Sequence, residues 1–179
     1  MASDHTSTHD GTPVSDIDVS ALLAGMAEEL RSIIRTGQQE VAMVGIRTGG
    51  VWVAEQLHAA LDLATSLGAL NINFYRDDFT RIGMHPQVTP SVLPFEVEGR
   101  HIVLVDDVLY TGRTIRAALN ELFDYGRPAR VTLAALVERN GRDLPIQADV
   151  SGMRITLEAK QQIKLSGPTP LALALSTRL

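Results

Sequence analysis

Cysteine is absent from the 179-residue sequence. Its absence excludes disulfide bonds, thiolate metal sites and cysteine nucleophiles, and it favours a cytoplasmic location. Long apolar runs are absent too, because glycine or charge interrupts every hydrophobic stretch, so we expect no transmembrane helix. The polar N-terminus lacks the basic start and apolar stretch of a signal peptide, and we interpret residues 1–15 as a disordered tail.

Basic residues are in the minority, with 16 Lys and Arg against 21 Asp and Glu and a formal net charge of −5. Nucleic-acid binding would therefore need a local basic patch. The sequence also has no Ser-His-Asp arrangement, no metal-ligand cluster at a familiar spacing and no G-x-x-x-x-G-K-[ST] phosphate loop. A covalent mechanism has no obvious nucleophile, nucleoside triphosphate hydrolysis is disfavoured, and we expect no metal site built by the protein alone.

The length and the hydrophobic content, 45% of all residues, suit one domain over residues 16–179. Hydrophobic spacing predicts helices over residues 17–35, 51–63 and 113–125. Apolar runs predict strands over 41–46, 101–105 and 130–137, and a loose alternation predicts another over 69–75. The pattern dissolves over residues 76–98, which predicts a long loop of the kind that is usually functional or disordered. Strands that alternate with helices predict an α/β fold with a mostly parallel sheet and helices on both faces.

Residues 101–114, HIVLVDDVLYTGRT, carry the strongest chemical signal. An apolar strand delivers Asp106 and Asp107 to its end, and a small-residue loop then opens a helix. Backbone amides at a helix start, with Thr hydroxyls beside them, suit a phosphate monoester. Two adjacent carboxylates would repel that phosphate unless they accept hydrogen bonds from ribose hydroxyls of the same ligand. The segment predicts a ribose 5-phosphate site, although the Asp pair alone is equally compatible with a solvated turn before a capped helix.

The whole string resembles the signature of type I phosphoribosyltransferases, which binds 5-phosphoribosyl 1-diphosphate (PRPP): four hydrophobic residues, two acidic, two apolar and a Thr-Gly-x-Thr loop. The segment GIRTGG at residues 45–50 is similar to the pyrophosphate loop of that superfamily. FYRDD at 74–78 and RNGRDLPIQADVSG at 139–152 resemble one branch within it, the PyrR proteins. These are pyrimidine operon regulators that are similar to a uracil phosphoribosyltransferase and often retain that activity. The resemblance covers about residues 17–157.

This resemblance implies a type I phosphoribosyltransferase fold with a small C-terminal hood, mainly over residues 143–179, and a role for each matching residue. Asp106 and Asp107 would bind the ribose hydroxyls of PRPP, and Arg76 with the loop after it would close over the transition state as a lid. The other substrate-binding residues would be Tyr110, Thr111, Gly112, Arg113 and Thr114 at the 5-phosphate, Val108 and Leu109 just before them, Arg47, Thr48 and Gly49 at the pyrophosphate, and Arg139 near the base. Residues 149–153 would form part of the hood over the base.

The implied reaction joins a nucleobase, with uracil favoured, to PRPP and gives UMP and pyrophosphate. Asp106, Asp107 and Arg76 are the catalytic candidates. Magnesium, carried mainly by the oxygens of PRPP, would neutralise the leaving pyrophosphate. Two alternatives stay open: a purine or orotate phosphoribosyltransferase, and a nucleotide-sensing regulator that binds the leader RNA of pyrimidine genes. We also expect a homo-oligomer and no membrane partner.

Two glycines depart from the pattern of the PyrR branch. Its members commonly have an arginine where this chain has Gly49, and losing that cation would weaken pyrophosphate binding unless Arg47 compensates. In the RNA-binding members, basic and His residues on the first helix and a His before the R-x-LPI segment contribute to the RNA face. Here the helix carries Glu28 and Glu29, and the loop position is Gly141. Any RNA-binding patch would have to come from Arg31, Arg35, Arg139, Arg142 and Lys164.

We also interpret three further residues, two aromatic or His side chains near the motifs and one His within the lid. Trp52, just after the pyrophosphate loop, is expected in the core and not against the base. His101 is expected on the surface at a strand edge. His85, within the lid, is only a weak catalytic candidate.

Overall fold

The computed structural model describes residues 17–72 and 89–177. Three features of the sequence analysis lie outside the described residues: the tail over residues 1–15, the FYRDD segment that contains Arg76, and His85. The lid that Arg76 and His85 were expected to belong to therefore stays a prediction.

Helices and strands alternate through most of the described residues, as predicted. Their order is α1 (Val19–Arg35), β1 (Val41–Ile46), α2 (Gly49–Leu61), β2 (Gly68–Leu70), β3 (His101–Leu109), α3 (Arg113–Asp124), β4 (Arg130–Arg139), β5 (Val150–Ile155), β6 (Gln161–Ser166) and β7 (Ala172–Thr177). None of the helices in these ranges is long and apolar enough to cross a membrane.

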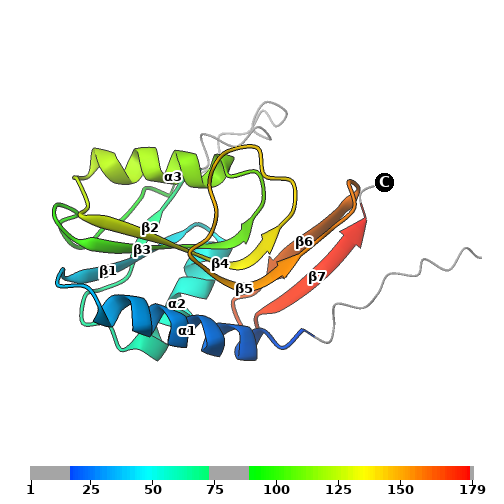
Figure 1. The fold of residues 1–179 in the computed structure, drawn as a ribbon, viewed down its shortest axis with the longest axis horizontal. Helices are drawn as coiled ribbons and strands as arrows, with labels where there is room; N and C mark the ends of the chain where they lie inside the picture. The colour runs from blue at the N-terminus through cyan, green and yellow to red at the C-terminus, as the bar shows by residue number, and fades with distance from the viewer. Residues whose placement is uncertain (1–16, 73–88, 178–179) are drawn as a thin grey trace, which may run out of the picture.

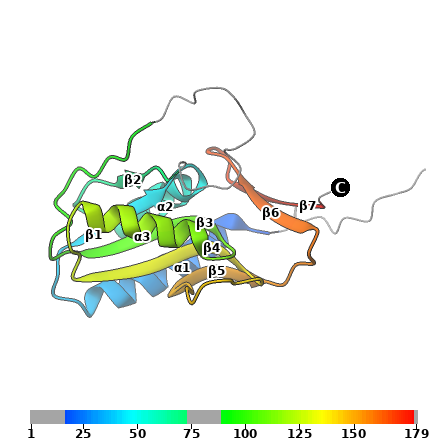
Figure 2. The same cartoon turned by 90° about the horizontal axis from the view of Figure 1, so that it is seen from above.

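The main sheet has the order β2-β1-β3-β4-β5, and all of its neighbouring strands are parallel. Helices α1 and α2 cover one face, and α3 covers the other (Figures 1 and 2). The predicted α/β fold, with a mostly parallel sheet and helices on both faces, is confirmed. Strands β6 and β7 form a separate antiparallel hairpin, which we call the hood hairpin. It lies beside the carboxyl end of β4, where a guanidinium nitrogen of Arg139 donates to the carbonyl oxygen of Gln161 at 3.0 Å.

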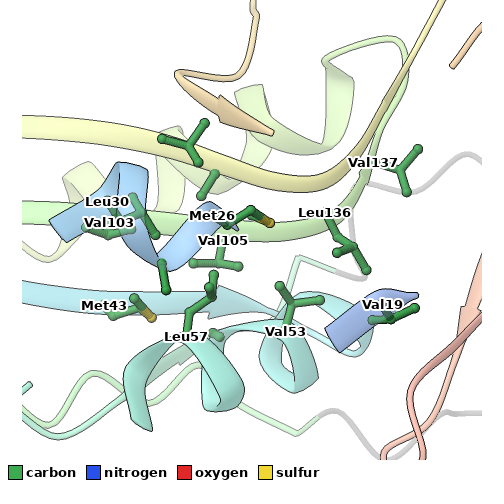
Figure 3. Close-up of a cluster of buried hydrophobic side chains, with 14 of the residues drawn as sticks. Val19, Met26, Leu30, Met43, Val53, Leu57, Val103, Val105, Leu136 and Val137 are labelled. Carbon is green, nitrogen blue, oxygen red and sulfur yellow. The ribbon is translucent and has the colours of Figure 1, made fainter. Parts of the chain in front are cut away.

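The α1–α2 face of the sheet buries the larger part of the core. The backbone N–H of Ala21 donates to the side chain of Asp18 at 3.0 Å, which caps the start of α1. Apolar side chains at helical spacing then face the sheet. Figure 3 shows this cluster, with Val19, Met26 and Leu30 from α1, Val53 and Leu57 from α2, and Met43, Val103, Val105, Leu136 and Val137 from the strands. Burial of each such side chain contributes about 1.5–3 kcal/mol to the stability of the fold. This packing holds α1 and α2 against the sheet and so positions the site.

Strand β3 is longer than predicted, and this changes the setting of the acidic pair. Pairing with β4 continues through Asp106↔Ala135 to Leu109↔Glu138, so both carboxylates lie within the strand and not on the turn after it. Successive side chains of a strand point to opposite faces. The side chains of Asp106 and Asp107 therefore lie in different environments. Asp106 is buried, with 3% exposure, and Asp107 is half-buried.

The interpretation of residues 149–153 as part of the hood is wrong for this structure. Val150 begins β5, the edge strand of the main sheet, which pairs with β4 through Ala134↔Val150. Asp149 fixes the strand start, because its side chain accepts a hydrogen bond from the backbone N–H of Leu133 at 2.8 Å. The pairing with β4 continues the parallel sheet by one strand before the hood hairpin begins.

The expectation that His101 lies on the surface is also wrong. His101 is fully buried, because β3 is the central strand and is covered by β1 and β4 on either side. Its Nε2 lies 2.8 Å from the hydroxyl of Thr132, whereas Nδ1 has no partner in the described part of the chain. Burial lowers the pKa of His101, and the positive charge of Arg130 lowers it further.

Candidate functional site

The carboxyl end of β3 places the acidic pair at the edge of the sheet where ligands of parallel α/β folds bind. The side chain of Asp106 accepts a hydrogen bond from the backbone N–H of Asp107 at 2.9 Å. Asp107 is half-buried, with its carboxylate beside the first residue of α2. Of the two carboxylates, Asp107 is the more accessible to a ligand, and Asp106 is the more firmly enclosed.

Residues 110–114 turn from β3 into α3, and we call them the phosphate loop. Gly112, the residue before α3, has a φ of +92°, which favours glycine at this turn. The hydroxyl of Thr111 accepts from the backbone N–H of Arg113 at 3.3 Å. The first backbone N–H groups of α3 lie at the positive end of the helix dipole, which suits a phosphate.

The segment after β4 supports this loop from the other side. The carbonyl oxygen of Thr111 accepts hydrogen bonds from the backbone N–H groups of Asp143 and Leu144, both at 3.1 Å. Arg113 and Asp143 form an exposed ion pair at 3.5 Å. Residues 139–152, which carry part of the resemblance, thus support the phosphate loop through these contacts. Their polar composition alone did not indicate this role.

The predicted pyrophosphate loop lies directly beside the acidic pair. Thr48 precedes α2, and Gly49 is its first residue. Arg47 bonds through its backbone N–H to the carbonyl oxygen of Leu70 at 2.9 Å, and its peptide bond to Thr48 is cis. The Nε of Arg47 is buried with no hydrogen-bond partner among the described residues. The two predicted loops, after β1 and after β3, are therefore brought together at one edge of the sheet.

Arg139 lies at the end of β4, between the phosphate loop and the hood hairpin. Its guanidinium carbon is 4.0 Å from the ring centroid of Tyr110, a cation–π contact. The same side chain is 9% exposed and donates to the carbonyl oxygen of Gln161. A pocket of about 310 Å³ opens here, lined by Val108, Tyr110, Arg139 and residues 159–164. We call it the hood pocket.

Sequence reasoning missed two contacts that hold the hood hairpin in place. The side chain of Asn140 bridges both backbone groups of Leu157, accepting from its N–H at 2.8 Å and donating to its carbonyl oxygen at 3.1 Å. Trp52 is half-buried and not in the core, because the α2 surface that carries it faces the turn of the hairpin at Gly167. Both contacts join segments that are distant in the sequence, so no local pattern indicated either partner.

The arginines considered for an RNA-binding patch do not gather in one place on the chain. Arg31 and Arg35 lie in the last part of α1, which leads into the amino end of β1. Arg139 and Arg142 lie at the carboxyl end of β4, the opposite edge of the same parallel sheet. Lys164 lines the hood pocket, as Arg139 does. One chain therefore offers two separate basic groups and not the single patch considered from the sequence.

The described residues contain no group of three or more His, Asp and Glu side chains that could hold a metal ion. Strand β3 brings the acidic pair Asp106 and Asp107 to the site. Magnesium is commonly bound through one or two carboxylates together with substrate phosphates and water. The donor set therefore fits a magnesium ion that arrives with a phosphorylated substrate.

Comparison with known protein families matches residues 17–167 to the phosphoribosyl transferase domain. Because the match spans most of the chain, the protein belongs to this family and is a phosphoribosyltransferase. A solved hypoxanthine phosphoribosyltransferase from Trypanosoma cruzi has a TM-score of 0.60 at 20% identity, with 77% of each chain covered. That likeness shows the fold, which confirms the expected type I phosphoribosyltransferase architecture.

Closer relatives define the branch. "Bifunctional protein PyrR" of Nitrosococcus oceani is 64% identical over 164 residues, which are 89% of this chain and 91% of that protein. The protein of the same name from Pseudomonas paraeruginosa is 59% identical over 153 residues, 85% of this chain and 90% of that one. The chain therefore belongs to the PyrR family, as its motifs suggested.

Proposed function

We propose that this protein transfers the 5-phosphoribosyl group of PRPP to uracil, with formation of UMP and release of pyrophosphate. The observation that carries the proposal is the shared edge of the sheet. The acidic pair, the phosphate loop, the start of α2 and the hood pocket all lie at or beside the carboxyl ends of β1, β3 and β4.

The ribose phosphate end of PRPP fits β3 and the loop that follows it. Asp106 and Asp107 accept hydrogen bonds from the ribose hydroxyls, and ionised acceptors make such bonds short and strong. The phosphate loop binds the 5-phosphate through backbone N–H groups and the hydroxyls of Thr111 and Thr114. Arg113 adds a positive charge beside them. These contacts hold the sugar so that its anomeric carbon faces the hood pocket.

The pyrophosphate end fits the start of α2. The N–H groups after Thr48 and the guanidinium of Arg47 stabilise the negative charge that builds on the leaving group. Asp106 and Asp107 would hold a magnesium ion that arrives with PRPP, and the ion would supply further charge neutralisation. The base then displaces pyrophosphate through an oxocarbenium-like state, and the residues of this chain act by positioning and electrostatics.

The hood pocket supports a base that is rich in carbonyl oxygens. Its lining includes the cations Arg139, Lys160 and Lys164 and no acidic side chain. Gln161 and Gln162 add amide groups. Uracil presents two carbonyl oxygens to such donors, whereas the amino group of adenine would meet few acceptors. Hypoxanthine and guanine also carry a carbonyl group, so the pocket lining does not separate them from uracil. The resemblance at residues 139–152 favours uracil over these two bases.

The test is a panel of bases. The protein is incubated with PRPP, magnesium and one of uracil, hypoxanthine, guanine, adenine or orotate, and pyrophosphate release is followed. We expect the highest kcat/KM with uracil, and UMP as the product. Equal or better turnover with a purine base would overturn the choice of substrate and leave the family assignment intact.

A second function, binding of pyrimidine leader RNA, is supported by a basic pocket that shares Arg139 with the hood pocket. This pocket of about 380 Å³ lies at the carboxyl ends of β4 and β5, and its lining also includes Arg142, Arg154 and Asn140. Arg154 also forms an ion pair with Glu138 at 2.9 Å, which offsets part of its charge. Two exposed arginines suit phosphate contacts, but their number favours weak binding.

A further inference from the structure

Strand β2 is short and lies at the edge of the main sheet, beside the predicted pyrophosphate loop. It spans three residues, Gly68–Leu70, and pairs with β1 in the sheet. The carbonyl oxygen of Leu70 accepts a hydrogen bond from the backbone N–H of Arg47 at 2.9 Å. The Nε of Arg47 has no hydrogen-bond partner among the described residues. The place of the Arg47 backbone, and with it the reach of the guanidinium, therefore depends on where β2 ends.

Residues 89–92 hold the end of β2 as well. Ala69 and Val92 exchange both of their backbone hydrogen bonds, each at 2.8 Å, as an antiparallel bridge. Just beyond β2, the backbone N–H of Asn71 donates to the hydroxyl oxygen of Ser91 at 2.8 Å. The side-chain amide of Asn71 also donates to the carbonyl oxygen of Thr89. Side chains thus extend the hold on this chain end beyond the last residue of the strand.

The hydroxyl of Ser91 in turn donates to the carboxylate of Glu121, in the second half of α3. A hydroxyl offers one donor and two acceptor lone pairs, whereas an ionised carboxylate only accepts. Glu121 therefore sets the direction of the Ser91 O–H, which leaves a lone pair of the same oxygen for the N–H of Asn71. Asn71 is buried, and Ser91 and Glu121 are half-buried. Loss of either partner would leave a poorly solvated polar group without a substitute.

We propose that Asn71, Ser91 and Glu121 form a clasp that fastens the end of β2 to α3 and thereby positions Arg47 for the pyrophosphate of PRPP. The three are positioning residues, because they act through the Leu70 carbonyl oxygen and not on the substrate. The clasp joins the supports of both ends of PRPP, since α3 begins in the phosphate loop. The inference rests on the proposed pyrophosphate role of Arg47 for its effect on PRPP, and not for its effect on the Arg47 backbone.

The first experiment measures hydrogen exchange of single backbone amides by NMR, without ligand. In Ser91→Ala and in Glu121→Ala, the amide of Arg47 should exchange about tenfold faster, the size of one lost hydrogen bond of this kind. The amide of His101 is the internal control. It bonds at 3.0 Å to a carbonyl oxygen at the amino end of the sheet, the edge opposite the clasp, and its exchange should not change.

Two further variants separate the hydrogen bond from the loss of helix surface. Glu121→Gln keeps an acceptor for the Ser91 hydroxyl and should stay close to the wild type at the Arg47 amide. Asn120→Ala truncates the exposed neighbour on the same helix and should leave that amide unchanged. Unchanged exchange of Arg47 in Ser91→Ala would overturn the proposal. Equal acceleration of the Arg47 and His101 amides would also overturn it, because it would mean a general loss of stability.

The second experiment compares the binding of PRPP with magnesium and the binding of UMP. The two ligands share the ribose 5-phosphate, and only PRPP carries the pyrophosphate. Ser91→Ala should weaken PRPP binding several-fold and leave UMP binding unchanged, and its effect on PRPP should shrink when Arg47 has already been replaced by alanine. Gly25→Ala, in α1 with nothing within 4 Å of the new methyl group, serves as the control with normal binding of both ligands.

The two experiments separate the claims. Normal PRPP binding by Arg47→Ala would refute the pyrophosphate role of Arg47, while the exchange of its amide still decides whether the clasp holds β2. Equal weakening of PRPP and UMP in Ser91→Ala would contradict the proposal, because a clasp that acts through Arg47 leaves the ribose 5-phosphate contacts intact.

Discussion

The guanidinium of Arg139 lies over the ring of Tyr110, with 4.0 Å between the guanidinium carbon and the ring centroid. The contact joins β4 to the phosphate loop and forms one wall of the hood pocket. Gly141 leaves room for the ring, because a Cβ there would lie 2.5 Å from Cε2 of Tyr110, and its φ is +104°. The space beside the glycine that departs from the PyrR pattern is thus filled by the ring of Tyr110.

Truncation of Tyr110 should act mainly on the base. In Tyr110→Ala the guanidinium of Arg139 loses its aromatic support, a contact that contributes about 0.5–2 kcal/mol, and we expect a several-fold higher KM for uracil. Tyr110→Phe keeps the ring and should stay near the wild-type KM. Steady-state kinetics with both substrates varied provides the measurement. Equal effects of the two variants would show that the hydroxyl, and not the ring, matters.

The buried His101 should make the protein less stable in mild acid. Its pKa is lowered by burial and by Arg130, whereas Asp149 acts in the opposite direction. The unfolded chain therefore takes up a proton at a higher pH than the folded chain. Below the unfolded value of about 6.5, the unfolded state binds more protons, and stability falls as the pH falls.

The measurement is urea unfolding at neutral pH and about one unit below the unfolded-state pKa of histidine. His101→Gln keeps an amide group near the hydroxyl of Thr132 but cannot titrate, so it should lose less stability between the two conditions than the wild type. An identical loss in both proteins would show that other groups cause the acid sensitivity.

The turn of the hood hairpin should depend on its contact with Trp52. A Cβ on Gly167 would lie 2.9 Å from Cε3 of the indole and 2.6 Å from Cδ2 of Leu171. Gly167→Ala should displace the turn and expose the indole, with a red shift in the emission of the chain's single tryptophan and a higher KM for the base. Gly25→Ala should leave both unchanged. Unchanged emission in Gly167→Ala would mean that the hairpin does not rest on Trp52.

RNA binding, where it occurs, should be weak and only moderately salt-dependent. With about −0.7 per phosphate contact for single strands, three or four contacts give a slope near −2 to −3. Replacing Arg142 and Arg154 with alanine should flatten the slope by about 1.4, whereas Arg116→Ala, exposed on α3, should not change it. Titration of leader RNA across a salt series with and without UMP gives the slope. Nanomolar binding that UMP tightens, with a slope steeper than about −5, would identify the chain as a dedicated regulator.

The sequence predicted the strand, loop and helix that carry the candidate site better than it predicted their surroundings. The order of hydrophobic, acidic and Thr-Gly residues at 101–114 is local, so the strand, loop and helix could be placed from it. The end of β3 could not, because pairing of Asp106 and Leu109 with β4 extends the strand beyond the apolar run. His101 was misplaced for the same kind of reason, since the central position of a strand depends on which strands pair with it.

Contacts between distant segments account for the rest. Trp52 and Gly167 meet only because the hood hairpin folds back toward α2, and no spacing in the sequence encodes that contact. Gly49 was interpreted, from the resemblance to the PyrR branch, as the loss of a cation. The structure adds that the carboxylate of Asp107 lies directly beside Gly49, a relationship that exists only once α2 packs against β3.

The most direct test of the central claim, that the acidic pair and the phosphate loop bind PRPP, is a calorimetric titration of the protein with PRPP and magnesium. The wild type is compared with a variant that carries Asp106→Asn and Asp107→Asn, whose unfolding temperature is measured in parallel. Each substitution keeps the size of the side chain and removes the charge that accepts from a ribose hydroxyl, a loss of about 1.5–3 kcal/mol per bond. We predict that a folded double variant binds PRPP at least tenfold more weakly than the wild type. A folded double variant with the affinity of the wild type would contradict the account.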